Sequence, residues 1–194
     1  MILRLIAVAV FAVSAFGTQV FADGELDTLM SKFDHGRLER FDATKAAALT
    51  EAHAKGAAPD IAVLDAALAG TPLPFEEKFD PTGRWSCRVM KLGKLLPLVV
   101  YPRFKCRITD DGSGWFLQKL TGSQRTSGRL YTASDTRLIY LGAGTVNDDP
   151  IVDYGKDQKA DEVAVVERLG KKKLVFMFPE PQLESLFDVL VLER

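Results

Sequence analysis

The chain has 194 residues, of which 47% are apolar and 26% are charged. This length and composition are typical of a single globular domain with one buried core and room for a small appendage. The 25 basic and 26 acidic residues give a formal net charge of −1, which provides no basic surface for nucleic acid or an anionic membrane. We therefore expect no nucleic-acid partner.

The N-terminus has the pattern of a secretory signal peptide. Arg4 precedes an apolar run over residues 5–16, and small residues at the cleavage-specifying positions place cleavage between Ala22 and Asp23. An uncleaved anchor is the alternative, but crossing a bilayer takes about 20 apolar residues. We predict a signal peptide over residues 1–22, a periplasmic or secreted mature chain, and no membrane span after cleavage.

Residues 23–72 are predicted to form a helical segment. The apolar stripe of Leu26, Leu29, Met30 and Phe33 has helical spacing, and His35-Gly36 is a candidate break. A second helix is predicted from Asp42 as N-cap to Gly56, and a third from Pro59 to Gly70. Prolines in 71–74 and the turn at 81–83 mark the end of this segment.

From residue 83 to residue 194, strand patterns recur at short spacing. The candidates are 84–91, 95–101, 103–109, 114–120, 128–133, 136–141, 161–168, 173–178 and 186–193. Asp110-Asp111-Gly112 and Gly170-Lys171 are typical of hairpin turns. Many short strands with such turns indicate a meander closed into a barrel, or a sandwich.

The predicted fold class is α+β, with N-terminal helices packed on a mainly antiparallel barrel. The segment Gly83-Arg84-Trp85 resembles the Gly-x-Trp that opens strand one of lipocalin-type barrels. Residues 174–178 and 95–100 are apolar on both faces, so those strands need cover outside the barrel as well. The preceding helices are the expected cover, and a partner chain is the alternative.

Cys87 and Cys106 are the two cysteines of the chain. Each lies in the middle of a predicted strand, in phase with an apolar face, and export leads to an oxidising compartment. We predict a disulfide between them if the two strands lie side by side. Free thiols, or a metal-binding or catalytic role, are the alternatives.

The polar stretch 121–128 is the candidate ligand site. Its hydroxyls, its amide and its guanidinium could hold a carboxylate or phosphate. A solvated hairpin loop is the alternative, since no phosphate-loop spacing is present. The predicted ligand-binding residues are Ser123, Gln124, Arg125, Tyr101 and Tyr131.

Other chemistry has little support in the sequence. The long connector 142–160 carries Asp148, Asp149, Asp153 and Asp157 without the order of an EF-hand, and His35 and His53 lack the spacing of a zinc pair. No nucleophile elbow is present. An enzyme would need Ser123, Arg125, Tyr131 and a loop aspartate to converge. We expect no catalytic residue, no metal and no cofactor.

Several segments resemble a secreted bacterial family, domain of unknown function 4893. They are Asp65-Ala-Ala-Leu-Ala-Gly70, Cys87-Arg-Val-Met-Lys-Leu-Gly93, Tyr101-Pro-Arg-Phe-Lys-Cys-Arg-Ile108, Lys119-Leu-Thr-Gly-Ser-Gln-Arg125, Val166-Glu-Arg-Leu-Gly170 and Glu184-Ser-Leu-Phe-Asp-Val189. Residues 126–131 and the long connector depart from the family pattern. The resemblance implies an exported protein with paired cysteines, and it implies no activity.

Two functions follow as hypotheses. A non-catalytic periplasmic module that binds an unknown small molecule predicts a pocket of several hundred Å³, mainly apolar with few polar groups. The alternative is an envelope interaction or inhibitor protein that binds another protein, which predicts an exposed apolar patch.

Overall fold

The computed structural model describes residues 23–76 and 78–194. The predicted signal peptide lies outside the described residues. The helices are α1 (Asp23–Leu29), α2 (Lys32–Glu39), α3 (Phe41–Lys55) and α4 (Ala58–Leu68). The strands are β1 (Gly83–Leu92), β2 (Leu98–Asp110), β3 (Trp115–Lys119), β4 (Gln124–Ser134), β5 (Arg137–Val146), β6 (Asp161–Gly170), β7 (Lys173–Pro179) and β8 (Phe187–Glu193).

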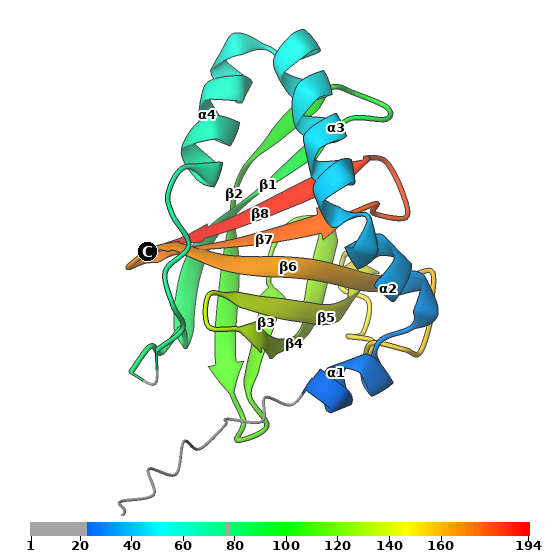
Figure 1. Cartoon of the computed structure of the whole chain (residues 1–194), viewed down its shortest axis with the longest axis vertical. Coiled ribbons are helices and arrows are strands. Elements are labelled where there is room, and N and C mark those ends of the chain that lie inside the picture. Colours follow the sequence, from blue (N-terminus) through cyan, green and yellow to red (C-terminus); the bar gives the residue numbers. More distant parts are fainter. Residues whose placement is uncertain (1–22, 77) are drawn as a thin grey trace, which may run out of the picture.

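The strands form a closed barrel in the order β1 to β8, and every neighbouring pair is antiparallel. Closure occurs between β1 and β8, where Cys87 pairs with Leu192 and Val89 with Leu190. Because closure leaves no unpaired sheet edge, the short strands need no other partner in the sheet. The prediction of helices followed by an antiparallel barrel is confirmed (Figure 1).

The candidates 95–101 and 103–109 prove to be one strand, β2, so nine predicted strands become eight. Pro102 interrupts the apolar pattern, but a β-bulge opposite Val89 accommodates it, because the register shifts there between Arg88 and Met90. Leu95 and Leu96 lie in the β1–β2 turn with 70% and 58% exposure, so the predicted cover is absent there.

Two apolar cores lie on the two sides of the barrel wall. The inner core consists of Trp85, Cys87, Cys106, Ile108, Leu117, Leu138, Tyr140, Ala164, Val166, Leu174, Phe176, Phe178, Leu190 and Leu192. The outer core joins the wall to the helices, with Val175, Met177 and Phe187 packed near Leu64 and Ala52. Strand β7 contributes to both cores, which explains why residues 174–178 do not alternate.

The helices cover the outer core in sequence order. Figure 1 shows α3 across β7, β8 and β1, with α2 beside β6 and α4 beside β2. The chain ends α1 before Ser31, whose hydroxyl caps α2 by accepting from the Asp34 backbone N–H. The predicted helix therefore breaks at Ser31 rather than at His35-Gly36. Phe33, the last residue of the predicted apolar stripe, is 44% exposed and so lies outside the core.

Within residues 23–76 and 78–194, no helix has the length and apolar character needed to cross a membrane.

One end of the barrel is closed by Trp85, which is 3% exposed. Its indole N–H donates to the Pro81 carbonyl at 2.8 Å, and the Arg194 guanidinium lies 4.2 Å from the ring centre. Arg194 also donates to the carbonyls of Asp80 and Thr82, in the connector that enters β1. Trp85 at the start of β1 and Arg194 at the end of the chain thus close this end of the barrel together.

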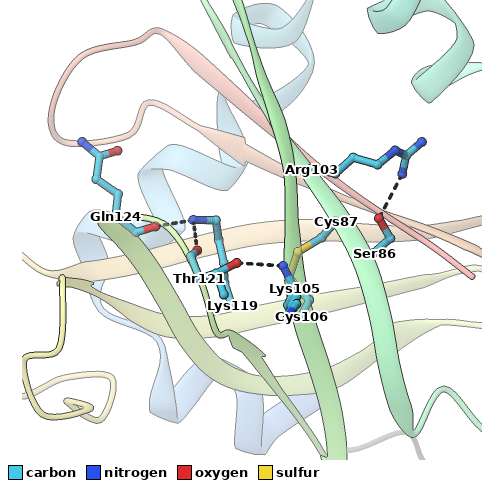
Figure 2. Close-up of a disulfide and its surroundings, with 8 residues drawn as sticks. All are labelled: Ser86, Cys87, Arg103, Lys105, Cys106, Lys119, Thr121 and Gln124. Atoms are coloured by element: carbon cyan, nitrogen blue, oxygen red, sulfur yellow. Dashed lines mark hydrogen bonds between the residues drawn. A yellow bond between two sulfur atoms is a disulfide. The ribbon is translucent and has the colours of Figure 1, made fainter.

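Cys87 and Cys106 form a disulfide across β1 and β2, with their Cα atoms 5.9 Å apart (Figure 2). Both are buried in the inner core because their strands are neighbours and each cysteine faces inward. The predicted pairing is confirmed, and both cysteines of the described chain are consumed by it.

Candidate functional site

The other end of the barrel is open and holds a cavity of about 300 Å³. Four connectors surround it, over residues 93–97, 120–123, 147–160 and 180–186, because antiparallel strands return to the same end at every second turn. In Figure 1, three of these connectors lie on the right, opposite the C-terminus. The cavity is lined by the inward-facing residues nearest the open end of the barrel, together with residues of these connectors.

Glycines on β4 and β5 keep this half of the barrel open. Gly128 and Gly142 face each other across the two strands, and a Cβ at either position would overlap the opposing backbone or the Tyr140 hydroxyl. Gly144 lies against the Glu162 carboxyl group, where a Cβ would come within 3.1 Å of an oxygen. The small residues therefore make room for two polar side chains inside the barrel.

Glu162 enters the cavity from β6. Its carboxyl accepts a hydrogen bond from the Thr126 hydroxyl of β4, and that hydroxyl accepts one from Tyr140 at 2.5 Å. Burial, together with the nearby Asp188 carboxylate, raises the pKa of Glu162 to about 7. Burial also raises the pKa of Tyr140 well above its usual value.

Asp188 enters from β8 and lies two strands away from Glu162. It accepts a hydrogen bond of 2.5 Å from the Ser185 hydroxyl, in the connector before the strand. Burial raises the pKa of Asp188 to about 6, against the opposing effects of that hydrogen bond and of the charge on Lys91. The cavity thus holds two carboxyl groups that titrate close to neutrality.

Lys119 ends β3 and is 6% exposed. Its ammonium donates to the carbonyls of Thr121 (2.9 Å) and Gln124 (Figure 2). It also lies 4.0 Å from the centre of the Phe104 ring. Burial lowers the pKa of Lys119 to about 8, and repulsion by Arg125 adds to that effect. The short polar connector after β3 therefore folds around a buried cation.

Lys91 carries a second ammonium at the mouth. It donates to Glu184 at 2.6 Å and to the Gln124 side chain at 2.7 Å, which joins β1 to the β7–β8 connector and to the start of β4. Its 11% exposure makes this pair a partly desolvated one. Ion pairing with Lys91 lowers the pKa of Glu184.

Helix α2 fixes two of the connectors that frame the cavity. Buried Asp34 and Arg37 form an ion pair of 2.5 Å, and Tyr154 of the β5–β6 connector donates to Asp34. Arg37 donates to the carbonyls of Glu180 and Asp161, at 3.2 Å each. One buried helical pair thus binds the backbone on both sides of the mouth, and Arg37 itself reaches the cavity wall.

The predicted ligand residues separate in the structure. Gln124 and Arg125 line the cavity, and Arg125 pairs with Asp148 at 3.0 Å. Ser123 is exposed beside the mouth, and the Tyr101 ring lies 6.0 Å from the Lys91 ammonium. Tyr131 packs against the outer core, on the side of the wall away from the cavity.

The enzyme constellation considered from sequence does not assemble, because Tyr131 lies on the outer face while Arg125 lies at the mouth. The connector predicted as 142–160 is shorter, since β5 continues to Val146. Among the described residues, no group of three or more histidine, cysteine, aspartate or glutamate side chains is placed to hold a metal ion.

Sequence reasoning missed four charged residues that line the cavity from the strands. They are Lys91, Lys119, Glu162 and Asp188. A local signal was present, since Lys91 continues the inward phase of Trp85, Cys87 and Val89. A charged residue in phase with a buried face is the pattern that would have pointed to a polar cavity.

Fold and cavity together define a closed antiparallel barrel with one filled end and one open, charged end. The family described as Domain of unknown function (DUF4893) matches residues 27–192. The chain belongs to this family, as its sequence motifs predicted. Comparison with curated proteins and with solved structures gave no match.

Proposed function

We propose that this protein is an exported, non-catalytic barrel that binds a small molecule in its open end. The observation that carries the proposal is the cavity of about 300 Å³, which has a solvent-facing mouth and a mixed apolar and charged lining. That volume lies at the lower end of the range for small-molecule sites. The lining is more charged than the mainly apolar pocket expected from sequence.

Two features support export. The N-terminal pattern predicts cleavage after Ala22, and the Cys87–Cys106 disulfide is of a kind that persists in oxidising compartments. Expression with a C-terminal tag, followed by fractionation and N-terminal sequencing, tests this part. We expect a chain that begins at Asp23 in the periplasmic or secreted fraction. Full-length chain retained in the cytosol would contradict it.

Native mass spectrometry of protein purified from the periplasm tests ligand binding. We expect a bound small molecule that is released on denaturation. Gln124→Trp places a large ring at the mouth and should lower the bound fraction, whereas Ser134→Trp, at the far end of the same strand, should leave it unchanged. Equal occupancy in both variants would contradict binding in this cavity.

A second candidate function is binding of another envelope protein at the same end. It is supported by exposed aliphatic side chains on all four connectors or at their edges, namely Leu95, Leu96, Leu120, Val146, Ile151 and Leu183. Such a cluster is typical of an interaction surface. A variant with serine at 95, 96 and 183 should lose a specific partner, while serine at Leu29 and Phe33, exposed on the helices, should retain it.

A further inference from the structure

Charges of opposite sign enter the cavity from opposite walls. In a closed barrel of eight strands, β3 lies across the axis from β7. Lys119 comes from β3, whereas Glu162 and Asp188 come from β6 and β8, which flank β7. The closed sheet therefore places Lys119 across the axis from the two carboxyl groups, while the charges of Lys91 on β1, next to β8, and of Arg37 act on the carboxyl groups from the side.

These three groups are held by neutral partners. Lys119 donates to two backbone carbonyls, Glu162 accepts from Thr126, and Asp188 accepts from Ser185. Across the described part of the chain, none of the three has an oppositely charged side chain within 4 Å. The rim differs, because Lys91 pairs with Glu184 and Arg125 with Asp148.

Burying a charge without a counter-ion is costly, and Lys119 is more than nine-tenths buried. A ligand with one charge would neutralise one wall and leave the other. A neutral ligand would remove the charged groups of both walls from water without forming an ion pair with either. A ligand with both charges neutralises both walls at once.

Apolar side chains form another part of the lining. Val89, Phe178 and Leu190 come from the barrel, and Leu183 stands at the mouth. The cavity volume of about 300 Å³ equals that of roughly ten water molecules, which suits a compact molecule. These side chains offer contact area to an aliphatic or aromatic body.

We infer that the cavity takes a small zwitterion with an apolar body, whose ammonium pairs with Glu162 and Asp188 and whose anionic group faces Lys119. This inference rests on the proposed small-molecule function and names its ligand class. The raised pKa values of the two carboxyl groups agree with it, since a bound ammonium would stabilise their charged forms.

Three probes with the same ring and chain length separate the charges: L-phenylalanine, phenethylamine and 3-phenylpropanoate. Calorimetric titration of the periplasmic protein, stripped of ligand by refolding with its disulfide intact, should show L-phenylalanine binding at least tenfold tighter than either singly charged probe. If phenethylamine bound as tightly as L-phenylalanine, the cavity would be a site for cations. If 3-phenylpropanoate bound as tightly as L-phenylalanine, it would be a site for anions. Either result overturns the inference.

Variants assign the two walls. Asp188→Asn should weaken L-phenylalanine and phenethylamine at least tenfold and leave 3-phenylpropanoate unchanged, while Lys119→Met should weaken L-phenylalanine and 3-phenylpropanoate. Lys105→Met, exposed on β2, is the matched control and should change nothing. Should Lys119→Met lower the melting temperature by more than a few degrees, Lys119→Gln replaces it. Equal effects of each variant on all three probes would contradict the assignment of the walls.

The same experiments distinguish a wrong ligand class from a wrong function. No binding of any probe, together with a co-purified neutral molecule lost in Gln124→Trp, would overturn the zwitterion and retain the ligand-binding barrel. No probe and no co-purified molecule in any variant would overturn both.

Discussion

The two ends of the barrel interior are built from the same alternating strands and reach opposite results. At the closed end, inward positions carry Trp85, Ile108 and Leu192, which fill the space. At the open end, the inward positions of the same sheet carry charges and glycines, which leave a cavity. Strand geometry decides which residues point inward, and in this barrel the size and polarity of those residues make one end solid and the other hollow.

The comparison also separates stability from function. The closed end buries apolar surface, which stabilises the fold. The open end places two carboxyl groups and an ammonium where burial shifts each pKa toward neutrality, which opposes folding. Residues that weaken a fold while lining a cavity are typical of a functional site.

The largest effect should come from opening the closed end. Trp85→Ala removes a fully packed ring and its hydrogen bond to Pro81, so we expect a loss of about 3–5 kcal/mol in the free energy of unfolding. Denaturant unfolding measures it. Trp115→Ala is the control, because Trp115 is half-buried against Phe75 and Phe79 and should cost less. Equal losses in the two variants would show that Trp85 contributes no more to stability than a half-buried tryptophan does.

Breaking the link between β1 and β2 should be the next largest effect. Reduction of Cys87–Cys106, which are 19 residues apart, should lower the free energy of unfolding by about 3 kcal/mol in the chain-entropy description. Thermal unfolding with and without reductant, after oxidation is verified by mass, measures it. Identical melting in both states would refute the prediction.

At the open end, a substitution should stabilise the protein. Burial raises the pKa of Glu162 from 4.5 to about 7, so the folded state binds the proton more tightly than the unfolded state. The resulting stability is complete below pH 4.5 and is lost as pH rises through about 7. Gln does not titrate, so the free energy of unfolding of Glu162→Gln should exceed that of the native protein by about 3 kcal/mol at pH 8, with the difference shrinking toward pH 4.5.

Denaturant unfolding of both proteins across this pH range measures the effect, with Glu39→Gln, exposed on α2, as control. A difference that does not change with pH would show that Glu162 keeps an ordinary carboxylate pKa in the fold.

The smallest effect should come from the rim of the mouth. Leu183 is 67% exposed, so Leu183→Ser should change the free energy of unfolding by no more than about 0.5 kcal/mol. Leu192→Ser, at the fully buried closed end, is the contrast and should be severely destabilising. A large loss for Leu183→Ser would show that the rim is part of the folding core.

Much of the fold followed from the sequence. Alternation and turn residues predicted most strands, and the matching phase of Cys87 and Cys106 predicted their disulfide. Two boundaries were predicted wrongly. Pro102 was taken as the end of a strand, but a bulge accommodates it within β2. The first helix was predicted to continue past Ser31, but Ser31 caps a new helix there.

The candidate site was predicted only at its edge. Gln124 and Arg125 were identified because a polar loop between apolar strands stands out in sequence. Glu162 and Asp188 were not, because single charges within strands look like ordinary solvent-facing residues.

By itself, the sequence determined the series of antiparallel strands, the amphipathic helices before them and the matching phase of the two cysteines, because strand period, helix period and cysteine phase are properties of short segments. Only the tertiary structure decided that Lys119, Glu162 and Asp188 share one cavity. Their strands are distant in sequence, and their inward side becomes common to all of them only when β1 pairs with β8 and the sheet closes.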